Sequence, residues 1–104
     1  MKQRVPEAAA LETTGEGRVR VAGSLGFPTV KALLPQGTDL IDRGQAFVID
    51  LAGVTDSDSA GLALLIEWLS VAKRAGRPLH YDNMPAQLHQ LANLSEVEAL
   101  VAAA

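Results

Sequence analysis

The chain has 104 residues, of which 48% are hydrophobic, and carries 9 basic against 12 acidic side chains and no cysteine. This length provides one domain with one core, and the apolar content excludes an intrinsically disordered chain. The lack of cysteine excludes disulfides, thiolate metal sites and a cysteine nucleophile. The scattered basic residues do not form the clustered footprint that nucleic acid binding requires.

Membrane insertion and secretion are not expected either. No apolar h-region follows Met1–Glu7, and no run approaches the roughly 18 apolar residues of a membrane span. We therefore expect a soluble, cytoplasmic protein without direct membrane insertion.

The N-terminal part predicts a loose lead-in followed by a hairpin. We expect residues 1–8 to form the lead-in and residues 9–104 to form a single domain. Ala9–Thr14 predicts a first strand, and Arg18–Ala22 alternates polar and apolar side chains, which is the period of a half-buried strand. The glycines of Gly15–Gly17 predict the turn between them.

The middle of the chain predicts a short helix and a central strand. Thr29–Leu34 has an apolar inward face. Pro35, Gly37 and the polar stretch to Gly44 are expected to end this helix, with room for a further helical turn around Leu40-Ile41. Ala46–Leu51 is a continuous β-branched and aromatic run, which is typical of a strand buried on both faces. Gly53–Ser59 then predicts a polar loop rich in helix-capping residues.

The second half predicts two helices around a short strand. Ala60–Ala75 is the strongest helix in the chain, with basic residues in its last turn and Gly76 after it. Pro78–Asp82 predicts a short strand, Ala86–Asn93 a helix, and Glu96–Val101 a last helical turn or two. This order predicts an α/β fold with a small mixed sheet of about four strands packed with three to four helices.

The start of the long helix is the candidate functional site. Ser59 lies between a buried strand and a helix N-terminus, where free backbone N–H groups and the helix dipole favour negative charge. A phosphoryl group on Ser59 would add about two negative charges, and Asp56 and Asp58 would oppose it by repulsion. The alternative is structural, because Ser57, Asp58 and Ser59 are ordinary N-cap residues, each contributing about 1 kcal/mol at most.

The same residues carry a resemblance to a known family. Asp58-Ser59-Ala60-Gly61-Leu62, placed after the strand, resembles the motif of STAS domains, the anti-sigma-factor-antagonist family. In that family the residue matching Ser59 is the Ser or Thr that a partner kinase phosphorylates, and Asp58 matches the acidic residue before it. The resemblance runs from about Arg18 to the C-terminus and implies the STAS fold.

One branch of the family is favoured. Gly23–Val30 resembles a stretch of the STAS subunit of Mla-type phospholipid ABC transporters, which maintain outer-membrane lipid asymmetry. Gly61–Leu65, Ala72–Gly76 and Leu88–Leu94 look like the same branch. Gly26 departs from both branches, since it stands where antagonists usually carry Asp and where the transporter branch often has Thr or Asp. The resemblance implies a non-enzymatic cytoplasmic subunit, peripheral to the inner membrane through its partner complex, that binds the transporter ATPase.

The second branch implies a different partner. As the alternative, the chain is an anti-sigma-factor antagonist that a serine kinase of the anti-sigma-factor type switches by phosphorylating Ser59. In the transporter branch the residue matching Ser59 lies at the contact surface and needs no phosphorylation.

The long helix supports docking on physical grounds. At about 100° per residue it carries two adjacent apolar stripes, the first formed by Leu62, Leu65, Ile66, Leu69 and Ala72, and the second by Ala60, Leu64, Trp68, Val71 and Ala75. One stripe covers the sheet. The other either packs against helices of the same domain or is exposed, in which case Trp68 is the natural interface anchor. The expected partner-binding residues are Asp56, Ser57, Asp58, Ala60, Gly61, Leu64 and Trp68, with Ser59 as phosphoacceptor or partner contact.

Catalysis has little to build on in this sequence. His80 and His89 fall on different elements, and no nucleophile motif, phosphate loop or metal-ligand spacing occurs. Asp50, Asp56 and Asp58 have the chemistry to bind a divalent cation, but caps and turns explain them more simply. We expect no catalytic residue, no cofactor and no metal site.

Overall fold

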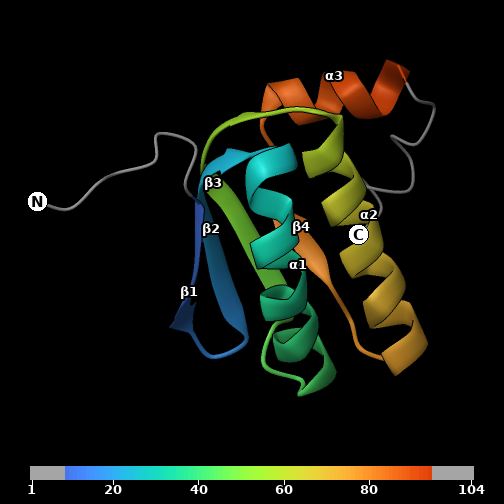
Figure 1. Cartoon of the computed structure of the whole chain (residues 1–104). Helices are drawn as coiled ribbons and strands as arrows, with labels where there is room; N and C mark the ends of the chain where they lie inside the picture. The colour runs from blue at the N-terminus through green and yellow to red at the C-terminus, as the bar shows by residue number, and fades with distance from the viewer. Residues whose placement is uncertain (1–8, 95–104) are drawn as a thin grey trace, which may run out of the picture.

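Four strands and three helices make up the described part of the chain, residues 9–94 of a computed structural model (Figure 1). The elements in chain order are β1 (Ala9–Gly15), β2 (Arg18–Leu25), α1 (Phe27–Asp42), β3 (Val48–Ser57), α2 (Ser59–Ala75), β4 (His80–Asp82) and α3 (Ala86–Leu94). The predicted mixed sheet with packed helices is confirmed. The expected lead-in at 1–8 and the helical turn at Glu96–Val101 lie outside the described residues.

The sheet has the strand order β1-β2-β3-β4. The predicted hairpin is present, since β1 and β2 pair antiparallel from Ala9 opposite Gly23 to Thr13 opposite Val19. Strand β2 pairs parallel with β3, and β3 pairs parallel with β4. Parallel strands need crossover connections, which α1 and α2 supply, so the three parallel strands end at the same edge of the sheet.

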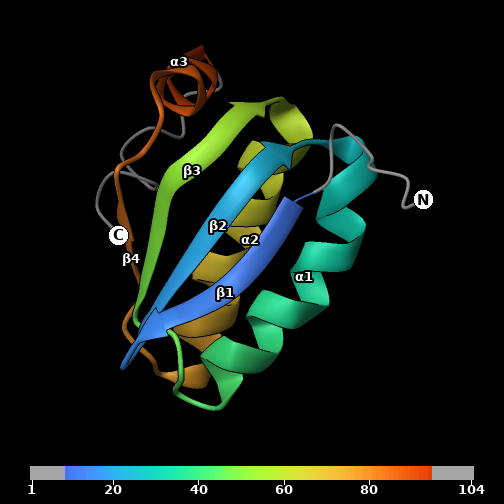
Figure 2. The same cartoon turned by 90° about the vertical axis from the view of Figure 1, so that its left-hand side faces the viewer.

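Helices α1 and α2 cover one face of the sheet, and no described element covers the other face (Figure 2). Along β3, Ile49 and Leu51 point to the helices and are buried, whereas Val48 and Asp50 on the opposite face are only half-buried. The expectation of a central strand buried on both faces is therefore wrong for the described residues. The apolar run has the composition of a strand that is buried on both faces. The polar Asp50 between the buried Ile49 and Leu51 instead fits a strand with one face open to solvent.

Helix α1 is longer than expected because it continues through Pro35. A proline inside a helix removes one backbone hydrogen bond and normally ends or kinks the helix. Here burial compensates, since Leu33, Gly37 and Ile41 recur every fourth residue and are all buried. The indole N–H of Trp68 on α2 also donates to the carbonyl of Leu34 over 3.2 Å, which links α1 to α2 just before the proline.

Strand β3 also runs further than expected, through the polar segment predicted as a loop. The reason is its neighbour, since β2 extends to Leu25 and continues the parallel ladder, with Gly23 opposite Val54 and Leu25 opposite Ser57. Backbone pairing with the long strand β2 thus keeps these residues in a strand although they have little intrinsic preference for one.

Helix α2 ends as the sequence predicts, with Gly76 in the left-handed conformation at a φ of 67°. The middle of its second apolar stripe is covered, because Leu64, Trp68 and Val71 are buried, whereas Ala60 is half-buried and Ala75 is exposed. The covered alternative is therefore correct for these three residues. Trp68 belongs to the core and is not available as a surface anchor.

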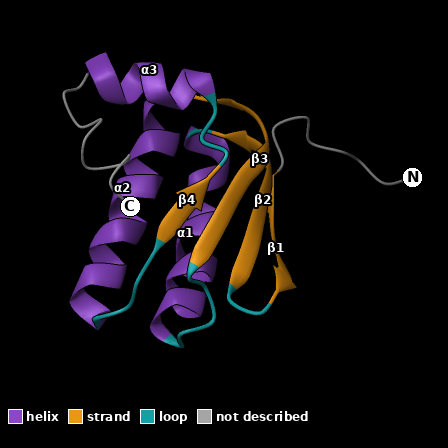
Figure 3. Cartoon of the chain, turned by 180° about the vertical axis from the view of Figure 1, so that it is seen from behind, coloured by secondary structure: helices purple, strands orange, loops and turns teal. Residues whose placement is uncertain are grey.

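The first stripe of α2 faces the sheet. The hydroxyl of Tyr81 on β4 donates to the carbonyl of Leu65 over 2.7 Å, and burial raises the pKa of Tyr81 well above its usual value. Helix α3 lies across the end of the molecule where β3 finishes and α2 begins (Figure 3). No helix in the described part of the chain has the length and apolar character needed to cross a membrane.

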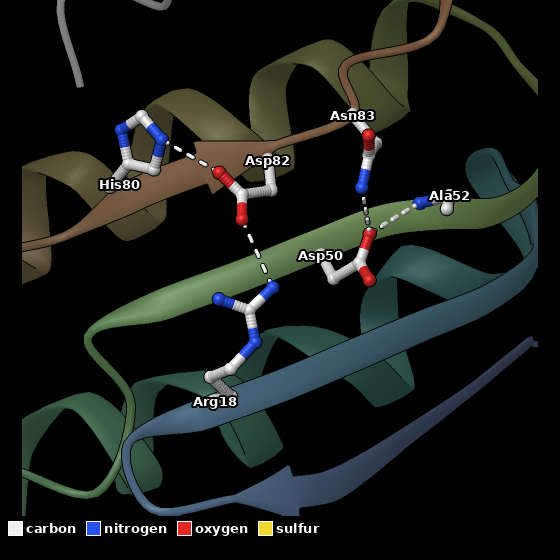
Figure 4. Close-up of polar contacts among 6 residues, drawn as sticks. All are labelled: Arg18, Asp50, Ala52, His80, Asp82 and Asn83. Atoms are coloured by element: carbon white, nitrogen blue, oxygen red, sulfur yellow. Dashed lines mark hydrogen bonds and ion pairs between the residues drawn. The ribbon is translucent and has the colours of Figure 1, made fainter.

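Polar side chains bridge the strands on the open face of the sheet (Figure 4). The Arg18 guanidinium lies 3.0 Å from the Asp82 carboxylate, which His80 also contacts at 2.8 Å. The side-chain amide of Asn83 and the backbone N–H of Ala52 each donate to Asp50 over 2.9 Å. These contacts lower the pKa of both carboxyls, through the Asn83 hydrogen bond at Asp50 and through the Arg18 hydrogen bond at Asp82.

Replacing Asp82→Asn should weaken the acid dependence of stability. A lowered pKa means that the carboxylate stabilises the folded state above the unfolded value of about 3.9. That contribution is lost as the pH falls through the folded-state pKa. Urea midpoints measured from neutral pH down to about pH 3 should therefore drop less in the variant than in the wild type. Asp42→Asn, which removes a charge without an ion pair in residues 9–94, is the matched control, and equal acid profiles for both variants would contradict the role of Asp82.

Candidate functional site

Helices α1 and α2 begin at the same end of the molecule, where β2 and β3 finish (Figure 1). Asp58 joins these two helix starts. One carboxylate oxygen, Oδ1, accepts the backbone N–H groups of Ala60 at 2.9 Å and Gly61 at 3.3 Å, so Asp58 is the N-cap of α2. The other, Oδ2, lies 3.5 Å from the backbone nitrogen of Phe27 at the start of α1.

Removal of this cap by Asp58→Ala should lower the free energy of unfolding by about 0.5–2 kcal/mol. The loss arises because two N–H groups of α2 lose their acceptor and the negative charge leaves the positive end of the helix dipole. Urea denaturation followed by circular dichroism measures it. Asp56→Ala is the control, since Asp56 is exposed and makes no side-chain hydrogen bond with the described residues, and an equal loss in both variants would refute the capping role.

Three of the expected contact residues lie on the surface at this end. Asp56 near the end of β3, Asp58 at the cap and Ser59 as the first residue of α2 are all exposed, and Ala60 beside them is half-buried. Ser59 is thus open to a partner or a kinase, and it directly follows Asp58 in the sequence. A phosphoryl group there would add negative charge to an end of the molecule that already carries the exposed Asp56 and Asp58.

Four other expected contacts are buried, namely Ser57, Gly61, Leu64 and Trp68, and the first two shape the turn. Ser57 is only 5% exposed, and its backbone N–H donates to the Gln87 side chain of α3 over 2.9 Å. Gly61 is buried, and a Cβ on it would lie 2.6 Å from the carbonyl oxygen of Leu25. Ser57 and Gly61, together with Trp68, are therefore not surface contacts.

An open groove between α1 and α2 adjoins the exposed end and was not predicted. Its volume is about 510 Å³, and it is lined by Phe27, Val30, Lys31, Leu34, Ala60, Ala63, Leu64 and Glu67. Phe27 on one wall is 81% exposed, whereas Leu64 is only 4% exposed. A contiguous apolar patch of this kind often marks an interaction surface, whereas single exposed apolar side chains are common and carry no such meaning.

The width of the apolar arc on α2 was the available signal for this groove. Which residues of that arc belong to the core and which line the groove cannot be predicted from the sequence, because this depends on where α1 packs against α2. Ala63 faces the groove although it belongs to neither of the two stripes.

The acidic residues and histidines do not converge on a metal. Within residues 9–94, no group of three or more His, Cys, Asp or Glu side chains is arranged to hold an ion. Asp50 lies on the open face of the sheet with Asn83, whereas Asp58 caps α2. His80 contacts Asp82, and His89 is exposed on α3.

Comparison with known families identifies the family of the domain. A family model described as "Mlab, STAS domain" matches residues 9–102. The chain belongs to the STAS domain family. This match confirms the resemblance that the residues around Ser59 indicate. STAS domains are generally binding domains that interact with partner proteins and are not enzymes.

Solved STAS structures share the fold at low sequence identity. The phosphorylated form of SpoIIAA, a Bacillus cell fate determinant, is 16% identical with a TM-score of 0.65, covering 86% of this chain and 84% of that one. The unphosphorylated form of this anti-sigma factor antagonist is 16% identical with a TM-score of 0.64, covering 83% and 82%. At such identity the likeness concerns the STAS fold alone.

A third solved structure with a similar fold is part of a larger protein. The murine Slc26a9 anion transporter is 18% identical with a TM-score of 0.57, and the alignment covers 76% of this chain but 14% of the transporter. No curated protein matches the sequence of this STAS domain.

Proposed function

We propose that this STAS domain is the non-enzymatic subunit that binds the ATPase of an Mla-type phospholipid ABC transporter. The observation that carries the proposal is the match of residues 9–102 to the family model described as "Mlab, STAS domain". In this proposal the chain acts in the cytoplasm, is held at the inner membrane through its partner, and supports a transporter that maintains outer-membrane lipid asymmetry.

The exposed end of α2 supports a docking role. Asp56, Asp58 and Ser59 present two carboxylates and a hydroxyl to solvent, and the apolar groove lies directly beside them. Interfaces combine an apolar centre with a polar rim in this way. The carboxylates favour a basic surface on the ATPase, which would orient the encounter.

An anti-sigma-factor antagonist is the second candidate, supported by the likeness to SpoIIAA and by the exposed Ser59. The match to the family model described as "Mlab, STAS domain" favours the first candidate. The Asp58 carboxylate accepts the N–H groups of Ala60 and Gly61, so a phosphoryl group on Ser59 would compete with it for these donors and repel it. This holds for either branch, since the antagonists also carry an acidic residue at the position of Asp58.

Affinity purification of the tagged chain separates the two candidates. The transporter proposal expects an ABC ATPase to be recovered in a stable complex that survives gel filtration. Recovery of a serine kinase without any ATPase would reject it and favour the antagonist.

Ser59→Asp tests the phosphorylation switch directly. If phosphorylation controls docking, the added charge should weaken partner binding at least about tenfold, a loss of about 1.4 kcal/mol, because it mimics the charge that phosphorylation would add at this exposed position. Ser59→Asn is the neutral control of similar size. Equal affinity of the wild type and Ser59→Asp, measured by calorimetry with the recovered partner, would show that binding is not switched by charge at this position.

A further inference from the structure

We infer that the groove between α1 and α2 receives the apolar face of an amphipathic helix of the partner protein. This inference rests on the proposed docking function and specifies the element that docks. It concerns the area next to the Ser59 turn, since most of the groove is formed by side chains one to two turns further along the two helices.

The groove has two helical walls and an apolar lining. Phe27, Val30 and Leu34 recur along α1 at helical spacing, and Ala63 lies on the facing side of α2. Ala63 is small and exposed, so it leaves the groove open between the larger side chains. Phe27 stands at the α1 edge with 81% of its surface exposed, which is unusual for a phenylalanine without a partner.

The backbone chemistry of the walls selects a helix as the occupant. Both walls are helices whose backbone groups bond within the helix, so the groove offers no free N–H or C=O row for a strand. An extended segment placed there would bury its own backbone groups without partners, which costs free energy. A helix satisfies its backbone internally and presents side chains at i, i+3 or i+4, and i+7, the spacing that such a groove accepts.

Charges on the two rims indicate which charge the partner helix carries beside its apolar face. Lys31 lies on the α1 rim and makes no ion pair among residues 9–94, whereas Glu67 on the α2 rim lies 3.7 Å from Arg74. The basic rim is therefore the less neutralised one. An acidic residue beside the apolar face of the partner helix complements Lys31, mainly by fixing the orientation of the complex.

Position links the groove to the proposed docking end. Ala60 lines the groove and directly follows Ser59, and Phe27 lies at the α1 start that Asp58 contacts. A partner that covers the exposed Ser59 turn therefore reaches the groove without leaving the surface. The two areas form one continuous face.

The test uses the purified ATPase of the Mla-type transporter and a pair of matched variants. Ala63→Arg fills the groove with a charged side chain, while Ala32→Arg places the same change on an exposed α1 position outside the groove. We expect Ala63→Arg to weaken binding at least about 30-fold, as for loss of an interface centre, and Ala32→Arg to bind as the wild type does. Circular dichroism of both variants checks that they fold.

The outcomes separate this inference from the proposed function. If the ATPase binds Ala63→Arg as tightly as the wild type, the groove is not the docking site, although the proposed function stands. If the ATPase does not bind the wild type at all, both fail. If Ala63→Arg instead converts a wild-type dimer to a monomer in gel filtration, the occupant is a second copy of this chain and the inference is wrong.

Photocrosslinking from position 27, where p-benzoylphenylalanine replaces the exposed Phe27 at the edge of the groove, identifies the occupying element. We expect crosslinks in the ATPase at residues three and four apart along one helix. Crosslinks confined to a strand or loop of the ATPase would overturn the assignment of a helix.

Discussion

Trp68→Ala should lower the free energy of unfolding by about 3–5 kcal/mol, the range for deleting a fully buried large aromatic side chain. The Trp68 side chain has no exposed surface and packs against Gly37 of α1, where no Cβ fits beside the indole. The variant also loses the hydrogen bond to the Leu34 carbonyl, which supports α1 next to Pro35. Both helices that form the groove therefore depend on this one side chain.

Urea denaturation followed by circular dichroism measures the effect, because Trp68 is the only tryptophan and its fluorescence disappears with it. Trp68→Phe provides a milder variant if the alanine form does not fold, and it should lose less stability because most of the apolar volume remains. Phe27→Ala is the exposed aromatic control and should cost far less. A loss below about 1 kcal/mol for Trp68→Ala, or reduced affinity at normal stability, would contradict the core assignment.

Gly61→Ala should lower stability by about 1–3 kcal/mol, the range for forcing extra atoms into a packed site. Helix propensity predicts the opposite, since alanine is favoured over glycine by about 1 kcal/mol inside a helix. Packing decides here, because the added Cβ would meet the Ser57 hydroxyl and lie 2.6 Å from the Leu25 carbonyl oxygen. The backbone carbonyl at the end of β2 cannot move without disturbing the sheet.

The matched comparison is Gly61→Ala against Ser59→Ala in the same helix turn. Ser59 is exposed, so its replacement should change the urea midpoint little. A stabilised Gly61→Ala variant would show that the start of α2 has room beside β2 and that propensity, not packing, governs this position.

The sequence predicted the order of elements because each carries a local signal. The alternation in Arg18–Ala22 marks a half-buried strand, and Gly76 marks the end of α2. The motif around Ser59 likewise indicated the family, which the match over residues 9–102 confirms. These features depend on a few neighbouring residues and need no tertiary information.

The errors concern features that depend on neighbours distant in sequence. The end of α1 was placed at Pro35 because a local rule says so, but contact with Trp68 and burial of Gly37 override it. Strand β3 extends because β2 beside it is long. The apolar arc of α2 was visible in the sequence, yet only the position of α1 separates core from groove.

This separation changes the candidate site. From the sequence we expect partner contacts at the Ser59 turn and along one stripe of α2. In the structure Asp56, Asp58 and Ser59 lie on the surface, but Trp68 is buried, and the apolar surface beside the turn is the groove. Phe27 and Ala63, which were not candidates, become the residues to test. The residues to test are thus selected by their exposure in the structure and not by their membership in the sequence motif.

Binding of the purified chain to the purified ATPase, measured by isothermal titration calorimetry, tests the proposed docking role most directly. The informative pair is Asp56→Arg at the docking end and Asp42→Arg at the last residue of α1, both exposed aspartates at opposite ends of the molecule. We expect a stoichiometric complex for the wild type and Asp42→Arg, and at least about tenfold weaker binding for Asp56→Arg. No binding by the wild type, or equal affinity of all three proteins, would refute the docking role.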